Sequence, residues 1–305
     1  MTKHLLPYVV LLISSVIWGI TGPVIKNTLG FVSPFTLLFW RFTFAVSISL
    51  PFFLFYLKKN PLKLSLLPKL FTIGVLGSAL PIIFVFYGFK LTSSIEATII
   101  GCMSPLLVAI AASVYLKERL SKHELVGTAL AIAGTVSVAI EPLFSGGLTG
   151  NNRLLGNLLI FINIICWMFC IMLVKHWKTD NLKPFHITAT SFITCLLVIA
   201  PLAFIESSGL PSIDFSNVEI LGGVLYLALF SSIIAYTLYY IGLAKVHAAQ
   251  ADIFNYLQPV FAIPLSVFWL KEKITPFIML GVFLMVTGVI VAEYHARKRR
   301  QKVVQ

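Results

Sequence analysis

The stretch PLLVAIAASVYLKERLSKHELVGTALAIAG at residues 105–134 returns 154 positions later as PVFAIPLSVFWLKEKITPFIMLGVFLMVTG at residues 259–288. Each copy opens on a proline, carries a Leu-Lys-Glu step in the middle and has glycines at the same two late positions. A repeat of this length in an apolar chain indicates a duplicated membrane domain. Duplicated helical membrane domains are typical of transporters, in which the substrate site lies where the two halves meet.

The composition also places the chain in a membrane. Of its 305 residues, 58% are hydrophobic and only 11% are charged, whereas soluble domains carry about 25% charged residues. Apolar runs of about 20 residues recur, and that length crosses a hydrocarbon core of about 30 Å. Ten helical spans are predicted, at residues 8–29, 34–57, 68–89, 93–116, 124–143, 154–174, 184–204, 218–243, 248–270 and 276–294.

The distribution of Lys and Arg predicts the orientation. With the N-terminus in the cytosol, the cytosolic loops and the tail hold most of the basic residues, as the positive-inside rule requires. We therefore expect a multi-pass protein of the plasma or inner membrane with both termini cytosolic, in contact with the lipid bilayer. The net charge of +12 belongs to these loops and to the tail, so it gives no reason to expect a nucleic-acid partner.

Five spans in each half is an odd number, so the second half must enter the membrane from the opposite side. The predicted fold is thus an all-α polytopic membrane protein with ten transmembrane helices in two inverted five-helix repeats. We place the first repeat at residues 1–147, the second at 148–296 and a basic cytosolic tail at 297–305.

The chain resembles the drug/metabolite transporter superfamily, specifically its EamA type, over essentially its whole length. The resemblance rests on the doubled pattern quoted above and on three shorter matches, Trp18-Gly19, Arg41-Phe42 and Leu257-Gln258-Pro259. It implies two inverted repeats around a central cavity and export of metabolites such as amino acids. The second repeat of the family usually reads Leu-Glu-Pro, and the neutral amide of Gln258 argues against proton coupling through this position.

Arg41 is the charge that the sequence singles out. It lies about seven residues into its span, roughly 10 Å deep, where an arginine costs about 2.5–3.5 kcal/mol on insertion scales. One interpretation is a hook for a substrate carboxylate, which guanidinium binds bidentately. The other is a fixed ion pair or a clamp on helix-end carbonyls. Glu96 starts its span on the same side, so it either pairs with Arg41 or favours the positive start of its own helix.

A second polar group follows in the ninth span. Asp252, Asn255 and Tyr256 stand at i, i+3 and i+4 and so share one helix face, which we expect to form part of a cavity wall. The alternative for Asp252 is helix capping combined with a salt bridge to Lys245.

Aromatic and amide side chains complete the predicted cavity. Trp18 and Trp167 occupy matching positions in the two halves, and Tyr236 and Tyr240 share a helix face. For the two tryptophans the alternative is a lipid-facing or packed ring. For the tyrosines and the amide it is packing within the bundle, where their polar groups need hydrogen-bond partners. Two further candidates of the same kind are Tyr87 and Asn163.

Prolines and glycines mark the repeat from within. Pro105 and Pro259 stand at equivalent mid-span positions, where the missing backbone donor predicts a kink or a hinge. Glycines at seven-residue spacing in spans 5 and 10 predict a seam for close helix packing or for a homodimer. These glycines are Gly127, Gly134, Gly281 and Gly288.

Other classes of protein lack their residue patterns here. The six histidines lie in loops, tails or span ends, and no paired acids or nucleophile motif appears, so no catalytic residue is predicted. The four cysteines form no Cys-x-x-Cys pair and no nucleotide-binding loop occurs, so neither a metal nor a cofactor is expected. The leading prediction is a secondary transporter that exports small metabolites by alternating access. The alternatives are a facilitative channel-like permease and, after it, an integral-membrane enzyme.

Overall fold

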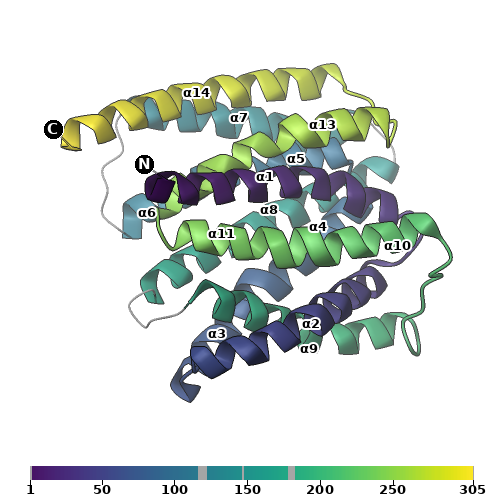
Figure 1. The fold of residues 1–305 in the computed structure, drawn as a ribbon. Helices are drawn as coiled ribbons and strands as arrows, with labels where there is room; N and C mark the ends of the chain where they lie inside the picture. Colours follow the sequence, from purple (N-terminus) through teal and green to yellow (C-terminus); the bar gives the residue numbers. More distant parts are fainter. Residues whose placement is uncertain (1, 116–121, 146–147, 178–182, 305) are drawn as a thin grey trace.

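The computed structural model describes residues 2–115, 122–145, 148–177 and 183–304, and these residues form a bundle of helices (Figure 1). Within these residues, eight helical segments are long and apolar enough to cross a membrane, and a shorter apolar helix covers Pro276–Val291. No strand occurs in the described ranges. The prediction of an all-α polytopic membrane protein is thus confirmed.

The predicted spans correspond to helices or to short series of helices. The first half contains α1 (Thr2–Thr28), α2 (Pro34–Lys59), η1 (Leu64–Leu66), α3 (Leu67–Gly74), η2 (Val75–Ala79), α4 (Leu80–Leu91), α5 (Ser94–Gly101), α6 (Ser104–Tyr115) and α7 (Lys122–Ser145). The second half contains α8 (Leu148–His176), α9 (Pro184–Glu206), α10 (Val218–Leu225), η4 (Tyr226–Ile234), α11 (Ala235–Leu243), α12 (Ala248–Asp252), η5 (Ile253–Leu257), α13 (Gln258–Phe268) and α14 (Pro276–Val304). The charged step of the first repeat, residues 116–120, lies outside the described residues.

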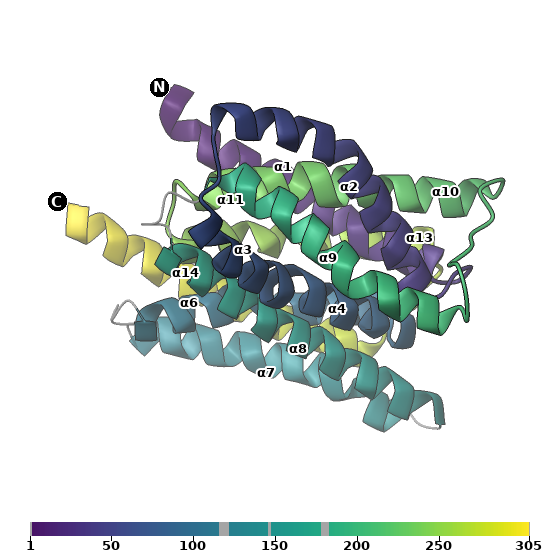
Figure 2. The ribbon, with the colours of Figure 1, turned by 90° about the horizontal axis from the view of Figure 1, so that it is seen from below.

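Helix packing repeats itself between the halves. α2 packs on α9 and α7 packs on α14, so each of these spans lies against its own counterpart (Figures 1 and 2). α1 packs on α11 and α13 of the second half, and α8 makes the equivalent contacts with α4, α5 and α6 of the first. Contacts that recur in this way reflect a pseudo-two-fold relation between two inverted repeats, as predicted.

Two lysines repeat the same relation at the level of side chains. Lys26 of α1 donates from Nζ to the carbonyl oxygens of Phe89 (2.8 Å) and Thr92 (2.5 Å), at the end of α4. Lys175 of α8 closes the end of α11 in the same manner, through the carbonyl oxygen of Leu243 at 2.5 Å. A lysine that binds the last carbonyls of a helix satisfies acceptors that have no partner within that helix.

Spans 4 and 9 are both interrupted near the middle. α5 ends at Gly101 and α6 starts at Ser104, whereas in the second half the 3₁₀ segment η5 separates α12 from α13. Pro105 and Pro259 are each the second residue of the helix that follows the break, a place where proline costs no hydrogen bond. The prolines therefore restart their helices after a break, and their role as hinges stays a prediction.

The glycine seam joins α7 to α14 within one chain. A methyl group at Gly134 would lie 2.5 Å from the carbonyl oxygen of Gly281, and one at Gly288 would lie 2.5 Å from that of Gly127. Backbones this close leave room only for glycine. The seam thus serves close packing inside the bundle, and its glycine faces are not available to a second copy of the chain.

The molecule has two distinct ends. Both termini lie at one end, which we call the terminal end, and residues 269–275 join α13 to α14 at the other, which we call the far end (Figure 1). The spans alternate in direction, so α5 starts at the far end and α8 also starts there.

Candidate functional site

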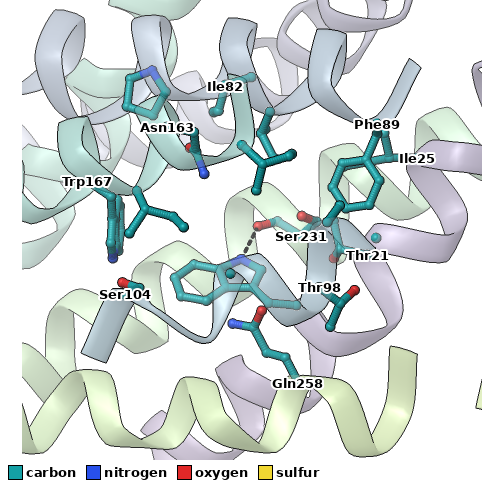
Figure 3. A pocket seen from close by; sticks show the side chains of 18 of the residues that line it. Thr21, Ile25, Ile82, Phe89, Thr98, Ser104, Asn163, Trp167, Ser231 and Gln258 are labelled. Atoms are coloured by element: carbon teal, nitrogen blue, oxygen red, sulfur yellow. Dashed lines mark hydrogen bonds between the residues drawn. The ribbon is translucent and has the colours of Figure 1, made fainter. Parts of the chain in front are cut away.

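A cavity of about 180 Å³ lies between the two halves. Its wall includes Trp18 and Asn163, which stand midway along α1 and α8. Figure 3 shows Thr98, Ser104 and Gln258 around the same hollow. A cavity at the junction of two inverted repeats, at the mid-depth of the bundle, is where transporters of this architecture bind their substrates.

The wall is largely apolar with a limited set of polar groups, which is the usual make-up of a small-molecule site. The apolar side chains come mainly from α4 and α8. They include Ile82, Val85, Phe86, Phe89, Ile160 and Ile164. The polar side chains are Trp18, Thr21, Arg41, Thr98, Ser104, Asn163, Trp167, Ser231, Tyr236, Asn255 and Gln258.

Arg41 supplies the positive charge of this wall. Only 3% of its surface is exposed, and its guanidinium donates from Nε to Ser232 Oγ (2.8 Å) and from Nη2 to Ser231 Oγ (3.3 Å). It also lies over the rings of Phe42 and Phe86, with its Cζ 5.3 and 5.4 Å from the two centroids. Within the described residues no ion pair joins Arg41 to a carboxylate. The described groups that contact this buried charge are therefore all neutral.

The serines that bind Arg41 belong to η4, a π-helical segment inside span 8. Its wider turn pairs Ser232 Oγ with the carbonyl oxygen of Leu227, five residues earlier, at 2.9 Å. The Ser231 carbonyl oxygen accepts from the Trp18 indole at 3.2 Å, the bond drawn in Figure 3. Insertions of this kind are frequent at functional sites because they re-aim side chains and free backbone oxygens. The matching span of the first half carries a π-helical segment as well, η2.

Aromatic rings form another part of the site. Trp18 meets Trp167 edge-on at a centroid distance of 5.9 Å, and Tyr236 and Tyr239 each lie 5.2 Å from Trp18. Such pairs contribute about 0.5–1.5 kcal/mol beyond the area they bury. Because Trp18, Trp167 and Tyr236 also line the cavity, their ring faces give this part of the wall an apolar surface beside their polar N–H and O–H groups.

Asp252 lies directly behind the wall and is fully buried. Its Oδ2 accepts from Ser104 Oγ at 2.7 Å. Its Oδ1 accepts from Asn255 Nδ2 at 2.7 Å, from the Tyr239 hydroxyl at 3.0 Å and from Trp167 Nε1 at 3.3 Å. Three of these four donors, Ser104, Trp167 and Asn255, line the cavity, so one carboxylate ties together wall residues from both halves.

Glu96 belongs to a separate charged network at the far end. It is fully buried, and its carboxylate accepts from Arg153 and from Asn157 Nδ2, the latter at 2.9 Å. Arg153 also donates to Glu141 Oε2 at 2.7 Å. Glu96 and Glu141 come from the first half, and Arg153 and Asn157 from the second. The network therefore ties the two halves together away from the cavity.

Glu272 makes a second contact between the halves at the far end. Its carboxylate accepts from the backbone N–H groups of Ser94 (2.7 Å) and Ile95 (3.0 Å), which open α5. Burial raises the pKa of Glu272 above its ordinary value, and these two N–H groups oppose that rise. An anion at a helix start is favourable because unpaired N–H groups and the helix dipole converge there. Glu272 thus acts as an interhelical lock.

Two pairings considered from the sequence do not occur in the structure. Arg41 does not pair with Glu96, because its guanidinium meets the serines of η4 whereas Glu96 meets Arg153. Nor does a salt bridge join Asp252 to Lys245 in the described part of the chain, since the carboxylate is surrounded by neutral donors.

The predicted site residues divide into two groups. Those on the cavity wall are Trp18, Arg41, Asn163, Trp167, Tyr236 and Asn255. The others lie elsewhere: Tyr87 donates to Glu206 Oε1 (3.0 Å) towards the far end, and the Tyr240 hydroxyl is 3.8 Å from the sulfur of Cys170. Tyr256 packs against a hydrophobic cluster apart from the wall.

Several wall and network residues were not among the predicted ones. Ser231, Ser104 and Thr98 line the cavity, but small hydroxyl residues are common in packed membrane helices, so nothing in the sequence distinguishes them. Glu141 was also missed. A carboxylate at the end of an apolar span can indicate a buried ion pair, but it is equally typical of a residue at the membrane surface.

Comparison with known proteins agrees with this architecture. The sequence matches the EamA-like transporter family at residues 5–140 and 154–294. It is similar to the uncharacterized transporter YyaM of Bacillus subtilis (strain 168), with 29% identity over 300 residues that cover 95% of this chain and 94% of YyaM. An uncharacterized transporter of Archaeoglobus fulgidus is 24% identical over 96% of this chain and 99% of its own length. A solved crystal structure shares the fold with a TM-score of 0.68 at 21% identity, covering 96% of this chain and 98% of that one.

Proposed function

Since the chain belongs to the EamA-like transporter family, we propose that it is a secondary transporter whose cargo is a small metabolite with a carboxylate group, of the amino-acid type. Membership of the family, together with the names of its relatives, makes the protein a multi-pass membrane transporter. The cargo, the direction and the mechanism are the proposed part.

The unpaired charge of Arg41 supports the choice of cargo. An arginine inside a membrane protein is costly unless it meets an anion, water or backbone carbonyls. Arg41 lines the cavity and is held by the hydroxyls of Ser231 and Ser232, which leave its positive charge uncompensated. A carboxylate in the cavity would supply the missing anion through charge-assisted hydrogen bonds.

The rest of the wall supports a cargo with an apolar part and further polar groups. The rings of Trp18, Trp167 and Tyr236 offer an apolar surface, and the amide of Asn163 offers both a donor and an acceptor. A molecule bound to Arg41 would thus place its carbon skeleton against these rings.

Alternating access fits the arrangement of the halves. The cavity lies between them, and spans 4 and 9, which contribute to its wall, are both interrupted beside it. The halves rock about the cavity, with the breaks before Pro105 and Pro259 as hinges. The distribution of Lys and Arg supports cytosolic termini in the cell membrane, and the resemblance to exporters supports efflux.

The test compares membranes that carry equal amounts of the parent protein, Arg41→Ala and Lys63→Ala. Lys63 is exposed, so the third variant removes a positive charge away from the cavity. Small molecules in the medium are profiled by mass spectrometry. We expect one class of carboxylates to accumulate outside cells with the parent and with Lys63→Ala but not with Arg41→Ala. Wild-type export by Arg41→Ala would exclude the role of Arg41 in binding.

A further inference from the structure

The carboxylate of Asp252 has a hydrogen-bond environment that tolerates a proton. Oδ1 accepts from two donor-only groups, the Trp167 indole and the Asn255 amide nitrogen, and from the Tyr239 hydroxyl. Oδ2 accepts from a single side chain, the Ser104 hydroxyl at 2.7 Å. A hydroxyl can donate or accept. When Oδ2 carries a proton, the Ser104 oxygen accepts from it and the Ser104 hydroxyl hydrogen is free to turn to the cavity, while the three donors to Oδ1 keep their acceptor.

Among the residues that the structure describes, no cation hydrogen-bonds to Asp252 or forms an ion pair with it. The elements packed against α12 are α6, α8, α11 and η5. The titratable group that they direct at the carboxylate is the hydroxyl of Tyr239, and Lys175 of α8 binds the carbonyl oxygens that end α11. By contrast Glu96, also fully buried, is paired with Arg153.

A path for the proton leads from the cavity to Asp252. Ser104 lines the cavity with its hydroxyl and bonds to Oδ2, so it stands between the two. In the relay, Ser104 passes its hydroxyl proton to Oδ2 and takes another from a hydronium ion in the cavity, which leaves as water. The carboxylate becomes a carboxylic acid and Ser104 is unchanged.

Protonation of Asp252 would also weaken hydrogen bonds made by residues of the cavity wall, which would contact the cargo. Trp167 and Asn255 bind the same oxygen, and Asn255 Oδ1 accepts in turn from Gln258 Nε2 at 3.0 Å. Neutralising the carboxylate weakens its bonds to these donors, because hydrogen bonds to a charged acceptor are roughly twice as strong as neutral ones.

We propose that Asp252 is the proton-binding site of this transporter, loaded from the cavity through Ser104, and that its protonation couples cargo movement to the proton gradient. The coupling rests on the proposed transport function, whereas the binding of a proton at Asp252 does not.

The first experiment uses the proton itself as the probe. Infrared difference spectra of the full chain in lipid vesicles are recorded between alkaline and acidic pH. We expect the C=O band of a newly protonated buried carboxyl group in the parent and in Glu96→Gln, and its loss in Asp252→Asn. The proposal fails if the band persists in Asp252→Asn, or if the parent has no band that Asp252→Asn lacks.

The second experiment tests coupling with a defined probe, an equimolar mixture of the standard L-amino acids sealed inside proteoliposomes. We expect efflux from parent vesicles to accelerate when the outside is acidified, and the ratio of acid-stimulated to unstimulated efflux to fall to about one in Asp252→Asn. Asp252→Glu, which keeps a titratable carboxyl group, should recover part of the stimulation. Ser104→Ala should lower the rate of acid-stimulated efflux.

The possible failures are distinguishable. Stimulation in Asp252→Asn equal to that of the parent, or parent efflux that ignores the gradient, overturns the coupling. If no amino acid leaves parent vesicles, the cargo class proposed above is wrong, whereas the infrared titration still decides whether Asp252 binds the proton. Circular dichroism and thermal melts of each variant identify any that fails to fold, and in that case Asp252→Glu and Ser104→Ala carry the comparison.

Discussion

Two arginines of this bundle, Arg41 and Arg153, have opposite surroundings. Arg153 at the far end donates to two carboxylates, those of Glu96 and Glu141. Arg41 at the cavity is more deeply buried, yet it meets two serine hydroxyls and no carboxylate of the described chain. Where an arginine holds helices together the chain supplies its counter-ion. Where the described chain supplies no counter-ion beside a cavity, the arrangement is consistent with the proposed carboxylate cargo.

Removing Arg153 should have the largest effect on folding. Arg153→Met would remove the arginine that Glu96 and Glu141 share, and breaking a buried ion pair by removing one partner costs about 3–5 kcal/mol. We expect a markedly lower Tm for the purified protein in detergent, with Lys63→Met as the control. Converting Glu96 and Glu141 to glutamine in the same chain should restore much of the loss. An unchanged Tm in Arg153→Met would show that the network is not structural.

Removing Arg41 should act on transport and much less on folding. Arg41→Ala takes away a charge that no carboxylate balances, so no buried anion is left alone and the Tm should stay close to that of the parent. Loss of a charge-assisted hydrogen bond, about 1.5–3 kcal/mol, lowers the apparent affinity for cargo roughly 10- to 150-fold. Concentration dependence of efflux from proteoliposomes measures this. Arg41→Lys should recover only part of the affinity, because an ammonium cannot make the two parallel hydrogen bonds that a guanidinium makes to a carboxylate. A large fall of the Tm in Arg41→Ala would show that Arg41, like Arg153, stabilises the fold.

Removing one serine from Arg41 sharpens the comparison further. Ser232→Ala deletes the acceptor of Arg41 Nε at 2.8 Å and leaves the guanidinium less firmly oriented. A net hydrogen bond contributes about 0.5–1.5 kcal/mol, so the apparent KM should rise several-fold with little change in maximal rate. Ser78→Ala is a matched control, since Ser78 holds the equivalent place in the first half and its hydroxyl has no hydrogen-bond partner among the described residues. Equal effects of the two substitutions would contradict the role of Ser232.

The smallest effect on transport is expected at Trp18, which contacts Ser231 and not the guanidinium of Arg41. Trp18→Phe keeps an aromatic ring in the wall but removes the indole N–H that binds the Ser231 carbonyl oxygen. Because this bond steadies η4 and does not touch the guanidinium, we expect at most a few-fold rise in KM in the same efflux assay. A loss as large as that of Arg41→Ala would show that the indole N–H itself binds cargo, beyond its contact with Ser231.

The sequence predicts the fold well because its signals are local or periodic. Hydropathy marks each span, and the 154-residue repeat indicates the two halves without any knowledge of contacts. It also directs attention to Arg41, Trp18 and Trp167, since a charge deep in a span and a repeated tryptophan are visible in one dimension. Each of these three lies on the cavity wall.

The partners of these residues could not be predicted in the same way. Arg41 meets Ser232 across 191 positions of sequence, and Glu96 meets Arg153 across 57. Which residue meets which depends on the rotation of each helix about its axis and on the π-helical turn of η4, neither of which hydropathy records. This is why a pairing of Arg41 with Glu96 was reasonable from depth alone and is absent from the structure.

The sequence by itself thus determined the membrane-spanning helices and their duplication. It also identified the polar residues inside these spans that need a partner or a function, because burial in lipid penalises polar groups wherever they stand along the chain. Only the tertiary structure decided which of those residues satisfy one another and which face a cavity. A hydrogen bond or an ion pair requires two groups within about 3 Å, and that proximity arises only when helices distant in sequence pack together.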